Sequence, residues 1–344
     1  MGAVTALEPE RSAELGEVIL KVEDLVKYFP VRRGLVEIVR REPERAVKAV
    51  DGVSFDIKKG ELFGVVGESG CGKTTMGRTI LRLLEPTAGK VTFEGIDVTA
   101  LSAEEMKMLR QRMQIIFQDP YESMNPRLDV FRIISEPLKI QGIVKNSHDA
   151  LRYVEKVLED VEMTPPEEYI YRYPHELSGG QRQRIAAARA LVLDPEFIVA
   201  DEPVSMLDVS IRGEILNLML SLSRERGVTF LYITHDLATA RHICDRIAVM
   251  YLGRIVEKGP TDSLIKHPLH PYTQALIGAV FVPDPKKKGF GRVLKGEVPS
   301  PVDPPSGCRL HPRCPIAQDI CKEVEPELVP AEDNHLVACH FAIG

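Results

Sequence analysis

One short segment has the glycines, lysine and threonine of a loop that binds nucleotide phosphates. It is Gly67-Glu68-Ser69-Gly70-Cys71-Gly72-Lys73-Thr74, the phosphate loop. Its glycines let backbone N–H groups converge on phosphate oxygens, where side chains would block the approach. Lys73 supplies positive charge toward the β- and γ-phosphates, and the Thr74 hydroxyl is a ligand for Mg²⁺. At the variable position Cys71 we expect only the backbone to matter. The predicted contacts are Gly67, Ser69, Gly70, Gly72, Lys73, Thr74 and Thr75.

Two carboxylates follow an apolar run further along the chain. Phe197-Ile198-Val199-Ala200 has the composition of a buried strand, and Asp201 and Glu202 come directly after it. In parallel α/β sheets the ends of such strands face the ligand crevice. There Asp201 would organise Mg²⁺ through its water shell, and Glu202 would polarise an attacking water as a general base. The alternative, a strand that simply ends in surface acids, has little weight beside an intact phosphate loop.

A second glycine-containing segment lies about a hundred residues downstream of the phosphate loop. It is Leu177-Ser178-Gly179-Gly180-Gln181. Ser178, Gly179, Gly180 and Gln181 open a helix, and the serine hydroxyl, the glycine N–H groups and the helix dipole suit a γ-phosphate that approaches from outside. A plain N-cap serine followed by flexible glycines would not explain the full pentapeptide or the Arg182-Gln183-Arg184 that follows it.

Composition sets limits on the class of protein. The chain has 344 residues, 44% hydrophobic and 27% charged, which suits a globular protein with a large core. A net charge of -6 gives no reason to expect nucleic acid as the main ligand. No apolar run reaches the ~18 residues of a membrane helix, and the acidic N-terminus lacks the features of a secretory signal. We therefore expect a membrane connection only through a partner.

The elements expected along the chain indicate an α/β protein with a mainly parallel sheet flanked by helices. Residues 1–17 form a loose, flexible tail, 31–45 a surface hairpin or loop, and 119–180 an inserted helical subdomain. Ser147 is the expected N-cap of a helix over 150–161. The other expected strands are 18–22, 50–57, 61–66, 197–200, 229–233 and 247–251, and the other expected helices are 74–84, 181–193, 211–226 and 238–244. From Pro260 onward we expect a separate C-terminal appendage.

These motifs in this order resemble ABC ATPases over residues 18–259. The resemblance implies a RecA-like parallel sheet with an antiparallel β subdomain. It also identifies Leu177–Gln181 as the family's signature, and implies that the signature of one subunit caps the nucleotide that another subunit binds. By the same resemblance Gln118 contacts Mg²⁺ and water, His235 holds the γ-phosphate and Glu202, and Ser205–Asp208 crosses the dimer interface. An aromatic residue should stack on adenine, and spacing favours Phe29 over Tyr28. The expected ligands are ATP and Mg²⁺, the latter at Thr74, Gln118 and Asp201.

Longer segments resemble the ATPases of oligopeptide and dipeptide importers, more closely the second of their two ATPase subunits. They are Gln118–Arg127, His267–Leu276, Pro299–Pro301 and Pro305–Pro315. The resemblance implies a different ATPase subunit as partner in preference to an identical one. It also implies two permease subunits that dock coupling helices, an extracytoplasmic binding protein and a peripheral position on the cytoplasmic face of the membrane. Peptide is the expected solute, with oligosaccharide as the alternative.

Four cysteines, Cys308, Cys314, Cys321 and Cys339, are concentrated in residues 260–344. In a reducing cytosol, clustered thiols more often bind metal than form disulfides. Their spacing is neither that of a zinc ribbon nor that of a ferredoxin, and free buried thiols remain the alternative. The importer resemblance favours a 4Fe-4S cluster, with Zn²⁺ as the alternative because His311, His335 and His340 lie nearby in sequence. Its expected role is structural, and a redox or ligand sensor is the rival.

A different class of function is a soluble ABC ATPase that acts on nucleic acid or ribosomes. Such proteins generally fuse two ATPase cassettes or insert long coiled coils. This chain has one cassette and no heptad run, so a transport ATPase is the favoured hypothesis.

Overall fold

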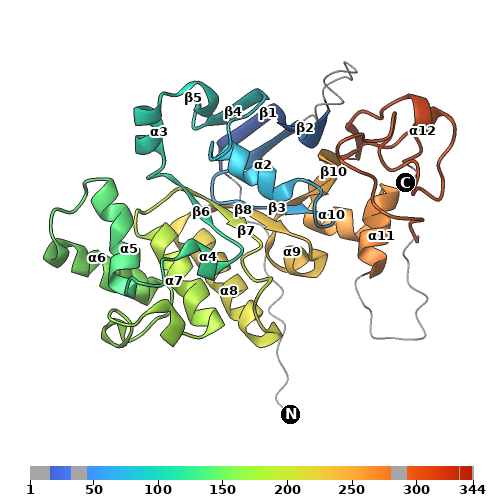
Figure 1. The fold of residues 1–344 in the computed structure, drawn as a ribbon. Helices are drawn as coiled ribbons and strands as arrows, with labels where there is room; N and C mark the ends of the chain where they lie inside the picture. Colours follow the sequence, from blue (N-terminus) through green and yellow to red (C-terminus); the bar gives the residue numbers. More distant parts are fainter. Residues whose placement is uncertain (1–15, 32–44, 280–292, 333, 343–344) are drawn as a thin grey trace, which may run out of the picture.

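The computed structural model describes residues 16–31, 45–279, 293–332 and 334–342. The predicted tail, except its last two residues, and most of the predicted loop at 31–45 lie outside these ranges. The described chain forms two sheets, with helices packed around the larger one (Figure 1). No helix in these ranges combines the length and apolar character that crossing a bilayer requires.

The smaller sheet is antiparallel, with the strand order β2-β1-β4-β5. Its strands are β1 (Val18–Pro30), β2 (Ala46–Lys58), β4 (Ala88–Phe93) and β5 (Ile96–Asp97). β1 and β2 are each longer than expected, because their pairing continues through several register shifts up to Pro30 and Ala46. The short elements η1 (Val98–Ala100) and α3 (Ala103–Leu109) follow this sheet. The predicted antiparallel β subdomain is therefore present.

The larger sheet has eight strands in the order β11-β12-β10-β9-β3-β8-β7-β6. Its parallel part consists of β3 (Leu62–Val66), β6 (Met113–Ile116), β7 (Phe197–Asp201), β8 (Thr229–Thr234) and β9 (Arg246–Tyr251). Successive side chains of each strand point to opposite faces of the sheet, and each face packs into its own hydrophobic core. In β3, Phe63 and Val65 pack toward the smaller sheet and α2 (Lys73–Ile80), whereas Leu62 and Val66 pack toward the other helices. Such strands, buried on both faces, are typical of parallel sheets.

The helices largely match the expected ranges, with shifted ends. They are α4 (Pro120–Ser123), α5 (Val130–Ile140), α6 (Ser147–Asp160), α7 (Gly179–Leu191), α8 (Val209–Arg226) and α9 (Leu237–Ile243), with η2 (Pro166–Glu168) and η3 (Pro174–Glu176). The prediction of Ser147 as N-cap is wrong. Asn146 caps α6 by accepting a hydrogen bond from the Asp149 N–H, and Ser147 is the first helical residue. Both residue types are good caps, so the sequence pattern left an ambiguity of one residue.

The described part of the C-terminal extension, residues 260–279, 293–332 and 334–342, is joined to the larger sheet. It contains α10 (Thr261–Lys266), α11 (Pro271–Ala279), α12 (Ile320–Glu323), β11 (Val329–Glu332) and β12 (His335–Val337). β12 pairs with β10 (Arg254–Pro260), and β11 pairs with β12. The extension therefore covers the edge that β10 would otherwise expose.

Glu257 on β10 links the sheet to two parts of the extension. Its fully buried carboxylate accepts hydrogen bonds from the N–H of Leu269 at 2.8 Å, the N–H of His270 at 3.0 Å and His335 Nε2 at 2.7 Å. Burial lowers the pKa of His270 to about 4, so this imidazole is neutral, and its Nδ1 accepts from the Tyr272 N–H. A buried polar group is tolerated when its hydrogen bonds are satisfied, as those of the Glu257 side chain are here.

Glu257→Ala should destabilise the extension, because it leaves two backbone donors and an imidazole buried without their acceptor. We expect a loss of about 3 kcal/mol, measured as a lower unfolding midpoint and faster protease cleavage after residue 260. Glu323→Ala, an exposed glutamate on α12, is the matched control and should behave like the unmodified chain. Equal midpoints for both variants would contradict the role of Glu257.

Candidate nucleotide-binding and catalytic site

The phosphate loop connects β3 to α2, and two of its glycines are required by close backbone contacts. A Cβ at Gly67 would lie 2.2 Å from the Met250 carbonyl oxygen. A Cβ at Gly72 would lie 2.0 Å from the Ala49 carbonyl oxygen, and Gly72 has a φ of +108°. Gly70 has open space around it but a φ of +80°. Strands β2 and β9 thus pack closely against one side of the loop, which leaves the N–H groups on its other side exposed.

Lys73, the first residue of α2, is buried and bends back along the loop. Its Nζ donates to the carbonyl oxygens of Gly67 at 2.7 Å and Glu68 at 3.1 Å, and lies 3.8 Å from Cys71 Sγ. Burial raises the pKa of the Cys71 thiol, so this side chain is a neutral group beneath the loop. The arrangement holds the ammonium beside the backbone that is expected to surround phosphate.

Two of the predicted Mg²⁺ ligands are in direct contact. Thr74 Oγ1 donates to Asp201 Oδ1 at 2.8 Å. Asp201 is almost fully buried, and burial raises the pKa of its carboxyl group. A hydroxyl and a carboxylate are the oxygen donors that Mg²⁺ prefers, so the donor set fits this ion.

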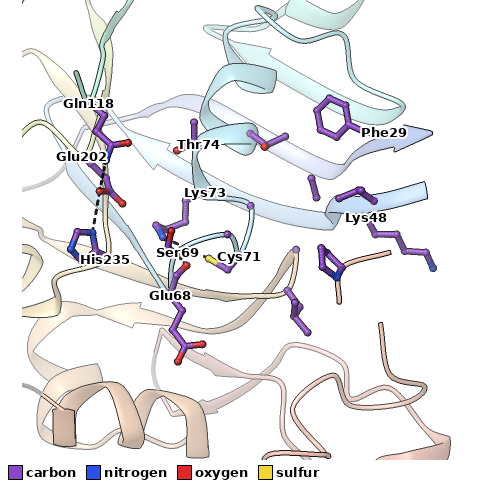
Figure 2. Close-up of a pocket in the computed structure, with 18 of the residues that line it drawn as sticks. Phe29, Lys48, Glu68, Ser69, Cys71, Lys73, Thr74, Gln118, Glu202 and His235 are labelled. Atoms are coloured by element: carbon purple, nitrogen blue, oxygen red, sulfur yellow. Dashed lines mark hydrogen bonds and ion pairs between the residues drawn. The ribbon is translucent and has the colours of Figure 1, made fainter. Parts of the chain in front are cut away.

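Glu202 brings the remaining polar residues together. Its Oε2 accepts from Gln118 Nε2 at 3.1 Å and lies 3.0 Å from His235 Nδ1 (Figure 2). Gln118, Glu202 and His235 follow β6, β7 and β8, which are neighbours in the sheet. Glu202 itself has a φ of 47°, a conformation that costs free energy in a residue with a side chain and is common at functional sites. The third predicted Mg²⁺ ligand, Gln118, thus contacts the general-base candidate.

Most of these residues line one pocket of about 700 Å³, but the predicted site residues Gly67 and Asp201 are not part of its lining. Besides the phosphate loop it includes Phe29, Lys48, Gln118, Glu202, His235, Leu276 and Pro301. Phe29 lies in the pocket, with Lys27 Nζ 5.0 Å from its ring centre. Tyr28 is engaged elsewhere: its hydroxyl donates to Asp51, and burial raises its pKa to about 12, with a further contribution from that bond.

Leu276 and Pro301 were missed by the sequence analysis as pocket residues. Both belong to the C-terminal extension, and the Lys48 N–H donates to the Pro301 carbonyl oxygen at 2.9 Å. Both residues lie in segments that resemble importer ATPases, but the sequence did not indicate that they line the pocket, because only the folded chain brings them to it.

The residues Ser178–Gln181 do not line this pocket. They begin α7 with a reciprocal cap, in which Ser178 Oγ accepts from the Gln181 N–H and Gln181 Oε1 accepts from the Ser178 N–H at 2.9 Å. Ser178 is exposed, whereas Gly180 is packed so closely on Ile211 that a Cβ would lie 2.6 Å from it. The helix start is therefore a fixed, accessible surface away from the chain's own pocket.

None of the four C-terminal cysteines is in a disulfide, and they lie close enough to affect one another electrostatically. The Cys308 N–H donates to the Cys321 carbonyl oxygen at 2.8 Å. Burial raises the pKa of Cys308 to about 11, and the other three thiols add to the rise. Within the described residues, no three His, Cys, Asp or Glu side chains are placed to hold a metal ion, so the structure gives no support to the predicted 4Fe-4S or zinc site.

The histidines suggested for a mixed zinc site are engaged elsewhere. His335 bonds to Glu257, His340 Nε2 lies 2.9 Å from the Val324 carbonyl oxygen, and His311 Nδ1 lies 3.0 Å from the Cys308 carbonyl oxygen. The structure thus gives no support to zinc held by these imidazoles together with the thiols.

Comparison with known proteins agrees with this geometry. Residues 50–205 match the ABC transporter family, and residues 256–321 match the C-terminal region of oligopeptide/dipeptide transporters. The oligopeptide transport ATP-binding protein AppF of Bacillus subtilis is 50% identical over 330 residues, 94% of this chain and 98% of AppF. The putative oligopeptide transport ATP-binding protein YkfD of the same organism is 52% identical over 300 residues, 87% of this chain and 91% of YkfD.

A solved structure shares the cassette part of the fold. The dimeric ATP-binding cassette MJ0796, bound to ADP and Pi in a post-hydrolysis state, superposes with a TM-score of 0.61 and 29% identity. The match covers 70% of this chain and 98% of that cassette. With its phosphate loop, its paired carboxylates and its matched C-terminal region, the chain belongs to the ABC ATPases, in the group of oligopeptide and dipeptide transport ATP-binding proteins.

Proposed function

We propose that this ATPase powers the import of oligopeptides or dipeptides through a membrane permease. The relatives named for oligopeptide transport, and the matched C-terminal region, support peptide over the oligosaccharide alternative. The observation that carries the catalytic part is the position of Glu202 between Gln118 and His235, facing the same pocket as Lys73.

The roles of these residues follow from the demands of phosphoryl transfer, which needs positioning and charge stabilisation more than covalent chemistry. The phosphate loop and Lys73 hold the β- and γ-phosphates, and Phe29 stacks on adenine. Bound Mg²⁺ would neutralise phosphate charge, held by Thr74, Asp201 and Gln118. Glu202 polarises the attacking water, and His235 orients Glu202 and contacts the γ-phosphate.

A second ATPase subunit completes the site in this proposal. The chain's own Ser178–Gln181 lies outside its pocket, so the corresponding signature of a partner would cap the nucleotide. Exposed apolar side chains support an interface beside Glu202: Met206 is 65% exposed and Val209 is 82% exposed. The resemblance to the second of two importer ATPases favours a different subunit over an identical one.

Two permease subunits are the proposed membrane partners, with a substrate-binding protein outside the membrane acting through them. The loop from Gln118 to Arg127 would receive a coupling helix. Within it, the Tyr121 side chain is 56% exposed and Arg182 stacks on its ring at 4.0 Å. In this proposal the chain is a peripheral subunit at the cytoplasmic face of the membrane.

The four cysteines are proposed to hold a 4Fe-4S cluster with a structural role. Two features support this: none of the four thiols is in a disulfide, and they lie within electrostatic range of one another. A cluster spreads its four thiolate ligands over several irons.

Glu202→Gln should abolish turnover while ATP binding persists, because the amide cannot accept a proton but fills the same space. In the complex with permease and partner ATPase we expect phosphate release to fall at least ~100-fold. Glu225→Gln, on the exposed end of α8, is the matched control. Wild-type turnover by the Glu202 variant would refute its assignment as the base.

Purification without oxygen should give about four irons and four sulfides per chain, with visible absorbance. Cys314→Ser should lose most of this iron, whereas Cys244→Ala, a thiol outside the set, should retain it. If the purified protein instead contains zinc and no sulfide, the cluster assignment is wrong and a zinc site replaces it. ATPase rates that differ between the oxidised and reduced protein would favour a sensor over a scaffold.

A further inference from the structure

The side chain of Glu68 leaves the nucleotide site and contacts the C-terminal extension. Glu68 is the second residue of the phosphate loop, and its side chain points away from Lys73 (Figure 2). Arg313 forms a bidentate ion pair with its carboxylate: Nη1 donates to Oε2 at 3.0 Å and Nη2 donates to Oε1 at 3.4 Å. A bidentate pair fixes the orientation of the carboxylate in addition to balancing its charge.

The extension also holds the backbone of Glu68. Its N–H donates to the Tyr272 hydroxyl at 2.8 Å. Tyr272, on α11, is fully buried, and its ring lies 4.7 Å from that of Tyr251 at the end of β9. The acceptor therefore cannot move without disturbing the core.

The opposite side of Glu68 faces the lysine expected to bind phosphate. Its carbonyl oxygen accepts from Lys73 Nζ at 3.1 Å. One residue thus connects the extension, through its carboxylate and its N–H, to the ammonium of the nucleotide site, through its carbonyl group.

Arg313 is itself fixed by the turn between two of the cysteines. The N–H groups of Arg313 and Cys314 both donate to the Leu310 carbonyl oxygen at 2.9 Å. The Arg313 side chain is 10% exposed, and its guanidinium lies 5.9 Å from the Tyr251 ring centre.

We propose that Arg313 and Tyr272 are positioning residues for ATP, and that the extension acts as a brace for the phosphate loop. By fixing the carboxylate and N–H of Glu68, they fix the direction of the carbonyl that meets Lys73. They also limit the conformations of the loop before nucleotide binds, so less order has to be imposed on binding. The contact needs the extension to be folded, whatever the cysteines hold.

The test is the affinity of the purified full chain for a fluorescent N-methylanthraniloyl derivative of ATP. Arg313→Ala should raise Kd about two- to fivefold, in keeping with a partly exposed ion pair. Tyr272→Phe should raise Kd by a similar factor. Arg313→Lys should bind more tightly than Arg313→Ala but less tightly than the unmodified chain, because lysine keeps the positive charge but cannot form the bidentate contact.

Lys322→Ala is the matched control. Lys322 is also a basic residue beside a cysteine of the extension, but it pairs with exposed Asp319 at 2.8 Å. Its Kd should equal that of the unmodified chain. Circular dichroism checks each fold, and if Arg313→Ala does not fold, Tyr272→Phe decides, because it removes a single oxygen.

A double-mutant cycle with Glu68→Gln separates a specific brace from general loosening. If Arg313 acts through Glu68, the Kd of the double variant should be about equal to the higher Kd of the two single variants. If the increases in Kd of the two single variants instead multiply in the double variant, the proposal is overturned. A wild-type Kd for the folded Arg313 or Tyr272 variant would also overturn it.

Discussion

The register of four parallel strands is the constraint on which the site depends. Val66 pairs with Thr234, Ile233 with Asp201, and Ala200 with Ile116. These pairs make β3, β8, β7 and β6 end at nearly the same level. The chain leaves each strand there into the phosphate loop, His235, Glu202 and Gln118 respectively. A slip of one residue in the register would turn every side chain of the strand to the opposite face, and Glu202 would then no longer meet its two partners.

Features that depend on a few neighbouring residues or on a short repeating pattern, such as the phosphate loop and the buried strands, could be predicted from the sequence. The phosphate loop was recognisable because the close approach of Met250 and Ala49 to the backbone demands glycine at fixed positions. The parallel sheet was recognisable because its strands are apolar on both faces. Helix ends were less certain: Asn146 and Ser147 can both cap, and only the fold selects Asn146. The choice between Tyr28 and Phe29 likewise depends on Asp51 on the neighbouring strand, which engages the tyrosine.

The contacts that attach the extension to the cassette escaped prediction for a physical reason. Its contacts with the cassette join residues far apart in sequence, such as Arg313 with Glu68 and His335 with Glu257. Neither pair has a short-range pattern, because an ion pair or a buried hydrogen bond imposes no spacing on the chain. The expectation of a separate appendage was drawn from its change in composition. The pairing of β12 with β10 instead makes the extension part of the main sheet.

The end of the pocket near Phe29 and the end near Glu202 and His235 differ in which residues form their walls. At the end near Phe29 the chain supplies its own wall, because Pro301 is tied to Lys48 by a backbone hydrogen bond. At the end near Glu202 and His235 no signature residue of the same chain lines the pocket, although Ser178 is already held in place by Gln181. In the proposed function this preformed helix start would serve the nucleotide of another subunit. The fold brings the phosphate loop, the proposed base Glu202 and Phe29 to one pocket of the chain, and the proposed association would close the end near Glu202.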